Sequence, residues 1–300
     1  MNIVAIDIGG TSIKYGVVNE NGEILKTDSE DTDAEKGVEQ LLEKIYFIVE
    51  KYLFNDKIKG IAVSATGQID AMKGKVVGGT ELIPGWIGTN LVDILQKKYS
   101  LPVVLENDVN CAALGEFWLG AAKNSDNFIC LTVGTGIGGG IVLNGELFRG
   151  EGFVAGEFGH IQIEKGGKNC GCGKKGCYQQ YASTTALLEL IKEKTGETLN
   201  GKEFFSNVTS IGGIYESILE KWCDYLTDGL STLVYIFNPR LIVIGGGISI
   251  QRDLLETYIN RSLKEKIGKN YNEILKIKMA DRGNDAGLLG ATYLLLQKII

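Results

Sequence analysis

The chain has 300 residues, of which 44% are hydrophobic and 23% are charged, and its formal net charge at pH 7 is −6. This composition is that of a globular protein long enough for two domains, and the acidic balance disfavours nucleic-acid binding, because a phosphate backbone needs a basic face. No basic stretch precedes the first apolar run, as it would in a signal peptide, and Asn238, Pro239 and Arg240 interrupt the most apolar window, so we expect a cytoplasmic protein with no membrane partner.

A strand–turn–strand unit occurs twice in the chain. Residues 2–8 form an apolar pattern typical of a strand, and a glycine turn, a second strand pattern, an Asn-Gly turn and a third strand pattern follow. Residues 129–149 repeat this order. The duplication predicts two related domains that flank a cleft.

Apolar residues recur at helical and strand spacing through the rest of the chain. They predict helices over 37–54, 91–100, 109–122, 184–196, 215–238, 253–267 and 285–299. They predict strands, some of which run into a loop, over 60–69, 101–108, 239–249 and 274–280. Because strands alternate with helices, we expect an α/β fold with hairpins at one edge of each sheet.

The first glycine turn combines groups that suit a phosphate with Mg²⁺. Asp7 ends the first strand, where its carboxylate can hold a hydrated cation. Exposed backbone N–H groups and a hydroxyl are typical of phosphate sites, and this turn supplies them from Gly9, Gly10 and Thr11, with Lys14 shortly after. The alternative is a plain β-turn.

Two further glycine runs follow later strands. Residues 134–140 contain the G-x-G-x-x-G pattern of dinucleotide sites, which should open a helix and meet an acidic residue about 20 positions later. Here a strand and a hairpin follow instead, so the run predicts a phosphate-binding hairpin. Residues 245–247 lie between a strand and a helix, and they suit either the flat face of a purine and its ribose or close helix–strand packing.

An acidic residue stands at the junction of a strand and a helix in the sequence E-N-D-V-N, residues 106–110. The end of such a strand points into the usual ligand crevice of an α/β protein. Asp108 can accept a proton from a hydroxyl nucleophile there, while Asn107 hydrogen-bonds another hydroxyl. The alternative is that Asp108 only caps the helix. Together the four loops describe a nucleotide-dependent phosphotransferase.

The only histidine of the chain lies close to three of its six cysteines, within residues 156–183. A reducing compartment and an odd number of thiols disfavour a disulfide knot, and a Cys/His nucleophile pair would explain one thiol only. Four ligands with no open position predict a structural zinc site of the Cys₃His type, formed by His160, Cys170, Cys172 and Cys177. Cys111, Cys130 and Cys223 lie in apolar patterns and are expected to be reduced core residues.

The motifs resemble those of the ROK family (repressor, open reading frame, kinase), within the actin/hexokinase/Hsp70 ATPase superfamily. They are D-I-G-G-T-x-x-K, E-N-D-x-N, G-T-G-x-G-G-G, G-E-F-G-H, C-x-C-G-x-x-G-C, G-G-G-I-S and D-A-G-L-L-G-A. The resemblance implies a two-domain ribonuclease-H-like (actin/hexokinase-type) α/β fold with duplicated mixed sheets and an interdomain cleft. It implies a small ATPase-like domain of residues 1–108, closed by residues 285–300, and a large domain of residues 109–284 with the second phosphate hairpin, the zinc loop and the adenosine loop.

The resemblance also implies an activity: ATP-dependent phosphorylation of a hexose, with glucose converted to glucose 6-phosphate as the first expectation and a homodimer as the assembly. Asp108 would be the general base. Phosphate and Mg²⁺ contacts fall to Asp7, Gly9, Gly10, Thr11, Lys14, Thr135 and Gly136, and adenosine contacts fall to Gly246 and Gly247. Sugar contacts fall to Asn107, Asp108, Glu157, His160 and Gln179.

One position departs from the family pattern. Relatives commonly have Glu two residues after the last cysteine, where it contacts the sugar, whereas this chain has Gln179. The alternatives are therefore a kinase for N-acetylmannosamine, N-acetylglucosamine, fructose or a β-glucoside. A sugar-sensing ROK regulator is disfavoured, because the first strand starts at residue 2 and leaves no room for a helix-turn-helix.

Overall fold

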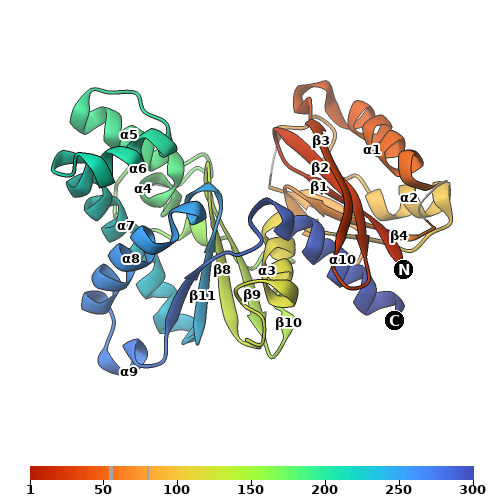
Figure 1. The fold of residues 1–300 in the computed structure, drawn as a ribbon. Helices are drawn as coiled ribbons and strands as arrows, with labels where there is room; N and C mark the ends of the chain where they lie inside the picture. The colour runs from red at the N-terminus through yellow and green to blue at the C-terminus, as the bar shows by residue number, and fades with distance from the viewer. Residues whose placement is uncertain (54–56, 80) are drawn as a thin grey trace. The chain divides into compact units, whose positions relative to one another are not determined.

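The computed structural model describes residues 1–53, 57–79 and 81–300. These residues divide into two compact units. Unit 1 comprises Met1–Asn124, Leu147–Ala155 and Asn284–Ile300, and unit 2 comprises Ser125–Glu146 and Gly156–Gly283. Each is built on a five-stranded sheet with helices packed on it (Figure 1). Within the described part of the chain, no helix is both long and apolar enough to cross a membrane.

The sheet of unit 1 has the strand order β3-β2-β1-β4-β7. Its first three strands form an antiparallel meander, while β4 and β7 extend it in parallel with β1, so the sheet is mixed. The strands are β1 (Asn2–Ile8), β2 (Ser12–Asn19), β3 (Ile24–Asp31), β4 (Ile58–Ala65) and β7 (Val103–Asn107), with a separate small hairpin of β5 (Gln68–Asp70) and β6 (Lys75–Gly78). The helices are α1 (Gly37–Leu53), α2 (Leu91–Tyr99), α3 (Asp108–Leu119) and α10 (Ala286–Ile299), with a 3₁₀ turn at Ala34–Lys36.

Alternation along β1 explains why helices cover both faces of this sheet, since successive residues of a strand point to opposite sides. Val4, Ile6 and Ile8 are fully buried in a core shared with α1 and α2. Ile3 and Ala5 point the other way, into smaller cores that involve α3 and α10. The strand is thus apolar throughout, as expected for the centre of a three-layer unit.

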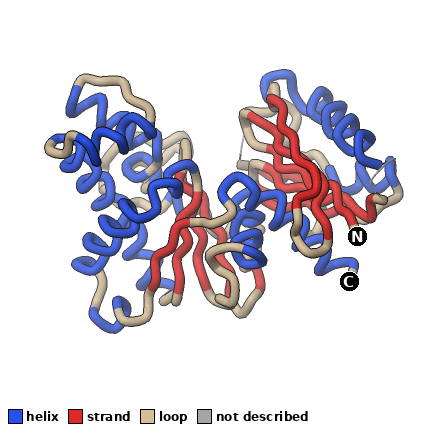
Figure 2. The backbone as a smooth tube through the Cα atoms, in the orientation of Figure 1, coloured by secondary structure: helices blue, strands red, loops and turns tan. Residues whose placement is uncertain are grey.

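The sheet of unit 2 repeats this pattern in the order β10-β9-β8-β11-β12. Figure 2 shows the strands of both sheets in red and the helices in blue. An antiparallel pair, β8 and β9, is followed by β11 and β12 in parallel. The strands are β8 (Phe128–Val133), β9 (Ile137–Leu143), β10 (Glu146–Leu147), β11 (Leu241–Gly245) and β12 (Lys276–Met279). The helices are α4 (Gln179–Ala182), α5 (Thr184–Thr195), α6 (Gly201–Ser210), α7 (Ile214–Phe237), α8 (Arg252–Lys266) and α9 (Lys269–Asn272), with 3₁₀ turns at Phe158–His160, Gly247–Gln251 and Gly283–Asp285. The prediction of an α/β fold with duplicated mixed sheets is confirmed.

Several details differ from the sequence-based expectation, and three of them concern longer helices. α1 ends at Leu53, and residue 54 of the expected helix lies outside the described residues. α6 was not expected, although its capping box between Asn200 and Glu203 is a local start signal. α3 follows the expected domain boundary at residue 108 yet belongs to unit 1, because it packs closely on α10: a Cβ on Gly290 would lie under 3.0 Å from the backbone of Cys111.

Candidate active site and metal centre

Three parallel strands of unit 1 bring the predicted acidic residues to one end of the sheet. Asp7 of β1 lies opposite Ser64 of β4, and Ala65 of β4 lies opposite Asn107 of β7. The carboxyl ends of parallel strands are the usual ligand edge of an α/β sheet. Asp7 and Asp108 are therefore close enough for the charge of one to affect the other.

The first glycine turn lines a cavity of about 520 Å³. Within it, the Oδ1 of Asp7 accepts a hydrogen bond of 2.5 Å from the Ser64 hydroxyl. Burial raises the pKa of the Asp7 carboxyl above its usual value. The hydrogen bond from Ser64 and the positive charge of Lys14 lower this pKa, but they do not cancel the effect of burial. A desolvated carboxylate favours a cation beside it, so this donor set fits Mg²⁺. The residues that line the cavity are Asp7, Gly9, Ser12, Lys14, Thr27, Asp28, Ser29 and Asn284.

Lys14 is held at the side of this cavity by the start of the C-terminal helix region. Its Nζ donates to the Asp285 carboxylate at 2.5 Å and to the Asn284 carbonyl at 3.1 Å. The ammonium group therefore stays near the glycine turn, where an anionic ligand would meet it. Gly10 and the exposed Thr11 complete the turn.

Asp108 is the first residue of α3, and the residue that caps this helix is Asn107. The Asn107 Oδ1 accepts from the backbone N–H groups of Val109 at 3.0 Å and Asn110 at 3.1 Å. Its Nδ2 donates to the Gly67 carbonyl and to Asp108 Oδ1, both at 2.9 Å. Through its contact with the carboxylate, Asn107 orients Asp108 directly.

Burial, and then repulsion from Asp7, raise the pKa of Asp108 to about 7. Hydrogen bonds from the Val109 N–H group and from Asn107 oppose this shift. A general base is most effective when its pKa lies near the working pH. The partly buried Asp108 carboxylate thus has the properties of a base for an alcohol.

The E-N-D-V-N turn is braced by Arg149, a residue that the sequence analysis missed. The side chain of Glu106 is 1% exposed, and its Oε2 accepts from Arg149 Nε at 2.6 Å. Its Oε1 accepts from the Asn107 N–H group and from Asn110 Nδ2, both at 2.9 Å. The sequence did hold a sign of such a partner, because Glu106 lies inside an apolar strand and a buried carboxylate requires a cationic partner. The sequence near Glu106 does not show that this partner is Arg149.

In unit 2, the second and third glycine runs lie at the same end of the sheet. β11 pairs with β8 so that Gly245 lies opposite Thr132. Gly246 has a φ of 90°, and a Cβ on it would lie under 3.0 Å from the Val133 backbone, so close packing explains this glycine. Thr135 and Gly247 are exposed beside it and accessible to a nucleotide.

The four predicted metal ligands converge in unit 2. The ligand atoms of His160, Cys170, Cys172 and Cys177 all lie within 4.8 Å of one another. Cys172 and Cys177 have their sulfur atoms 3.6 Å apart, and Cys170 Sγ lies 3.7 Å from His160 Nδ1. In a tetrahedral shell with zinc–sulfur bonds of about 2.3 Å, sulfur atoms lie about 3.8 Å apart, so the donor set fits zinc.

Charge in this cluster also favours a cation. Burial opposes ionisation of Cys170, but hydrogen bonds from Cys172, Cys177 and His160 lower its pKa to about 6. Burial and the neighbouring thiols raise the pKa of Cys177 to about 12. A bound metal would remove this opposition to ionisation, because metal binding favours the thiolate form of cysteine. The other nitrogen of His160, Nε2, lies 4.0 Å from the Glu157 carboxylate, so the ring connects the cluster to a predicted sugar contact.

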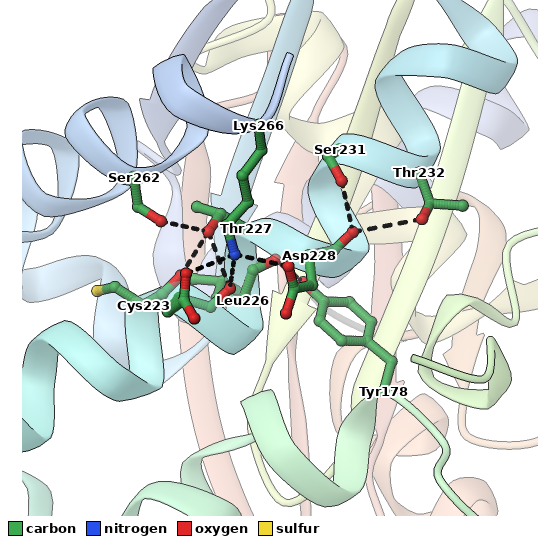
Figure 3. Close-up of polar contacts among 10 residues, drawn as sticks. Tyr178, Cys223, Leu226, Thr227, Asp228, Ser231, Thr232, Ser262 and Lys266 are labelled. Carbon is green, nitrogen blue, oxygen red and sulfur yellow. Dashed lines mark hydrogen bonds and ion pairs between the residues drawn. The ribbon is translucent and has the colours of Figure 1, made fainter. Parts of the chain in front are cut away.

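Tyr178 anchors the metal loop to helix α7. Its ring is fully buried, and its hydroxyl donates to the Leu226 carbonyl at 2.6 Å (Figure 3). At the next two residues of α7, Ser262 of α8 contacts Thr227 at 2.6 Å and Lys266 of α8 contacts Asp228 at 2.6 Å (Figure 3). The loop thus rests on a pair of helices that are themselves tied together.

Gly229→Ala is expected to destabilise the protein by about 1–3 kcal/mol. A Cβ there would lie under 3.0 Å from the Tyr178 ring, and overpacking of this size outweighs the gain in helix propensity of about 1 kcal/mol. Urea unfolding measures the difference. Gly201→Ala is the matched control, because a Cβ there meets nothing within 4 Å; equal stability of the two variants would contradict the proposed contact.

Three comparisons place the chain among known proteins. The sequence model of the ROK family matches residues 3–298. A β-glucoside kinase of Listeria monocytogenes serovar 1/2a is 39% identical over 303 residues, which cover 99% of this chain and 98% of that protein. The crystal structure of a ROK family glucokinase from Streptomyces griseus, in complex with glucose and AMPPNP, matches with a TM-score of 0.85 and 32% identity over 99% of this chain and 100% of that chain. A ROK family transcriptional regulator, a homolog of the E. coli MLC protein, matches with a TM-score of 0.86 and 25% identity over 99% of this chain and 80% of that chain.

Proposed function

The chain belongs to the ROK family, and on that premise we propose that it is an ATP-dependent sugar kinase that phosphorylates a hydroxyl group of a hexose. The observation that carries the proposal is Asp108, a carboxylate at the head of α3 with a pKa raised to about 7. It lies in the same unit as the cavity lined by Asp7 and Lys14. A base for an alcohol and a place for phosphates are the two requirements of this chemistry.

Phosphoryl transfer needs positioning and charge neutralisation more than covalent catalysis. Asp7 would hold Mg²⁺, which when bound with ATP offsets charge on the phosphates. The Gly10 N–H group, with Thr11, Lys14, Thr135 and Gly136, would contact the phosphates, and Gly246 and Gly247 would lie against adenosine. The Gly9 N–H group donates to the Ser12 carbonyl at 3.0 Å, so Gly9 would shape the turn. Asp108 accepts the proton of the sugar hydroxyl as that oxygen attacks, and Asn107 keeps the carboxylate aimed.

We assign the sugar contacts to Asn107, Asp108, Glu157, His160 and Gln179. Glucose is the first expected substrate, in keeping with the glucose complex of the Streptomyces griseus relative. A β-glucoside is the second, because the β-glucoside kinase of Listeria monocytogenes is 39% identical to this chain. N-acetylated hexosamines and fructose complete the series of alternatives.

A coupled assay of ADP release tests the proposal, with glucose, fructose, N-acetylmannosamine, N-acetylglucosamine and the β-glucoside cellobiose as acceptors. We expect turnover with glucose or cellobiose at least about 100-fold above ATP hydrolysis without sugar, as one general base can supply. No turnover with any acceptor, together with retained sugar binding in calorimetry, would instead support a sugar-sensing regulator.

The structural zinc on His160, Cys170, Cys172 and Cys177 is part of the same proposal. Its support is the spacing of the ligand atoms, all within 4.8 Å. The homodimer stays a prediction from the family resemblance, and the cytoplasmic location stays a prediction from the sequence.

A further inference from the structure

The side chain of Gln179 lies between the metal cluster and the second glycine turn. Its Nε2 donates to Cys170 Sγ at 3.6 Å. On the other side, a Cβ on Gly159 would lie 2.6 Å from its Oε1, and a Cβ on Gly136 would lie 3.0 Å from it. The amide therefore faces a thiol ligand with its nitrogen and the glycine turn with its oxygen.

The backbone fixes this position from both directions. The Tyr178 N–H group donates to the Ile161 carbonyl at 2.7 Å, and the Gln179 carbonyl accepts from the Ser183 N–H group at 3.3 Å. The buried Tyr178 ring holds the preceding residue against α7. Gln179 thus reaches Cys170 from a rigid segment, which makes a directional contact with the sulfur effective.

The chemistry of the cluster decides which end of the amide meets the sulfur. A metal-bound cysteine is a thiolate, which accepts hydrogen bonds and donates none. Three thiolates and a neutral histidine around one divalent cation leave a net negative charge. An N–H donor beside such a sulfur is stabilising, and charge-assisted hydrogen bonds are roughly twice as strong as neutral ones. A carboxylate at the same place would offer no donor and would add like charge.

We propose that Gln179 is a positioning residue of the metal centre, whose amide donates to the Cys170 thiolate and strengthens metal binding. Because the thiolate accepts a hydrogen bond from the amide nitrogen of Gln179, the amide oxygen points to the glycine turn at residues 134–136. The metal centre and this turn are thereby linked through one side chain. The inference rests on the proposed zinc site but not on the proposed kinase activity, since it concerns metal affinity alone.

Zinc competition with a chromophoric chelator tests the inference on the zinc-loaded protein. Gln179→Glu is expected to lower zinc affinity about 10- to 100-fold, the usual effect of losing an outer partner of a ligand. Gln179→Met, of similar length but without a donor, should lower it less. Gln180→Glu is the matched control, since it adds the same charge at the next residue, which is also half-buried.

Equal zinc affinity of Gln179→Glu and Gln180→Glu would overturn the inference, whether both are unchanged or both are lowered. A second measurement distinguishes loss of the hydrogen bond to Cys170 from a general destabilisation of the metal loop. In the cobalt-substituted protein, loss of the donor raises the energy of the sulfur electrons, so the sulfur-to-cobalt charge-transfer band of Gln179→Met should move to longer wavelength. An unchanged band in Gln179→Met, with the variant folded by circular dichroism, would also overturn it.

Discussion

Asp108→Asn is expected to lower turnover about 10²- to 10⁴-fold and at the same time to stabilise the folded protein at pH 8. Asparagine keeps the shape of the side chain but cannot accept the proton of a sugar hydroxyl. The substitution also replaces a carboxylate, whose charged form destabilises the folded protein, with a neutral amide. Burial and the nearby Asp7 are the cause, since both raise the pKa of Asp108.

The sign of the stability change follows from proton linkage. The pKa of Asp108 is raised from 3.8 to about 7 on folding. The folded protein therefore has its full free energy of unfolding below about pH 4, where Asp108 is protonated in both states, and it loses part of this free energy as the pH rises through 7. The full shift corresponds to about 4 kcal/mol. Water reaching the partly buried group reduces this, and we expect about 1–2 kcal/mol at pH 8.

Thermal unfolding at pH 8 and at pH 4 measures this change, and the gain should vanish at the lower pH. For the unsubstituted protein, kcat/KM should fall below about pH 7, because it reports the base of the free enzyme. Asp93→Asn is the control, since Asp93 lies in the first turn of α2 and its side chain is 51% exposed. Full turnover of Asp108→Asn would exclude this residue as the base, and lower stability at pH 8 would contradict its desolvation.

Cys172→Ser is expected to remove the metal and to destabilise the loop around it by several kcal/mol. Cys172 is the exposed cysteine of the cluster, so the exchange of sulfur for oxygen costs little packing. It deletes one of four ligands, and structural zinc contributes about 10–16 kcal/mol of binding energy in isolated zinc-finger peptides. The anchor at Tyr178 makes the effect smaller here.

Elemental analysis should find one zinc per chain in the unsubstituted protein and far less in Cys172→Ser. Limited proteolysis should then cut the variant between residues 156 and 178. Cys223→Ser is the matched control, because that thiol is buried in α7 outside the cluster and its replacement should leave the zinc content unchanged. A native protein without zinc, or a fully loaded Cys172→Ser, would be incompatible with the proposed site.

Local sequence was sufficient wherever the residues of a feature lie close together along the chain. The first glycine turn, the E-N-D-V-N junction and the four metal ligands each fall within about one loop, so spacing alone predicted which residues come together. The strand patterns of both sheets were equally local. The capping box and the amphipathic pattern of α6 were local as well, so this helix could have been predicted from the sequence.

Contacts between distant segments could not be predicted in the same way. The partner of Glu106 is Arg149, and the partner of the Tyr178 hydroxyl is the Leu226 carbonyl. Periodicity says that a side chain is buried but does not say which segment covers it. The position of α3 in unit 1 has the same origin, because it depends on packing against α10. The amide of Gln179 is a further case, since its direction depends on a sulfur atom nine residues earlier.

Helix α10 has a consequence for the order of folding during synthesis. The strands of the first sheet have all been synthesised once Asn107 is made, but the helix that covers Ile3 and Ala5 begins only at Ala286. At about 5–20 residues per second, the intervening chain takes roughly 9 to 36 s to synthesise. The segments of unit 2 end at Gly283, so the unit that starts the chain is the last to be completed, and one apolar face of its sheet depends on chaperones or on transient contacts until then.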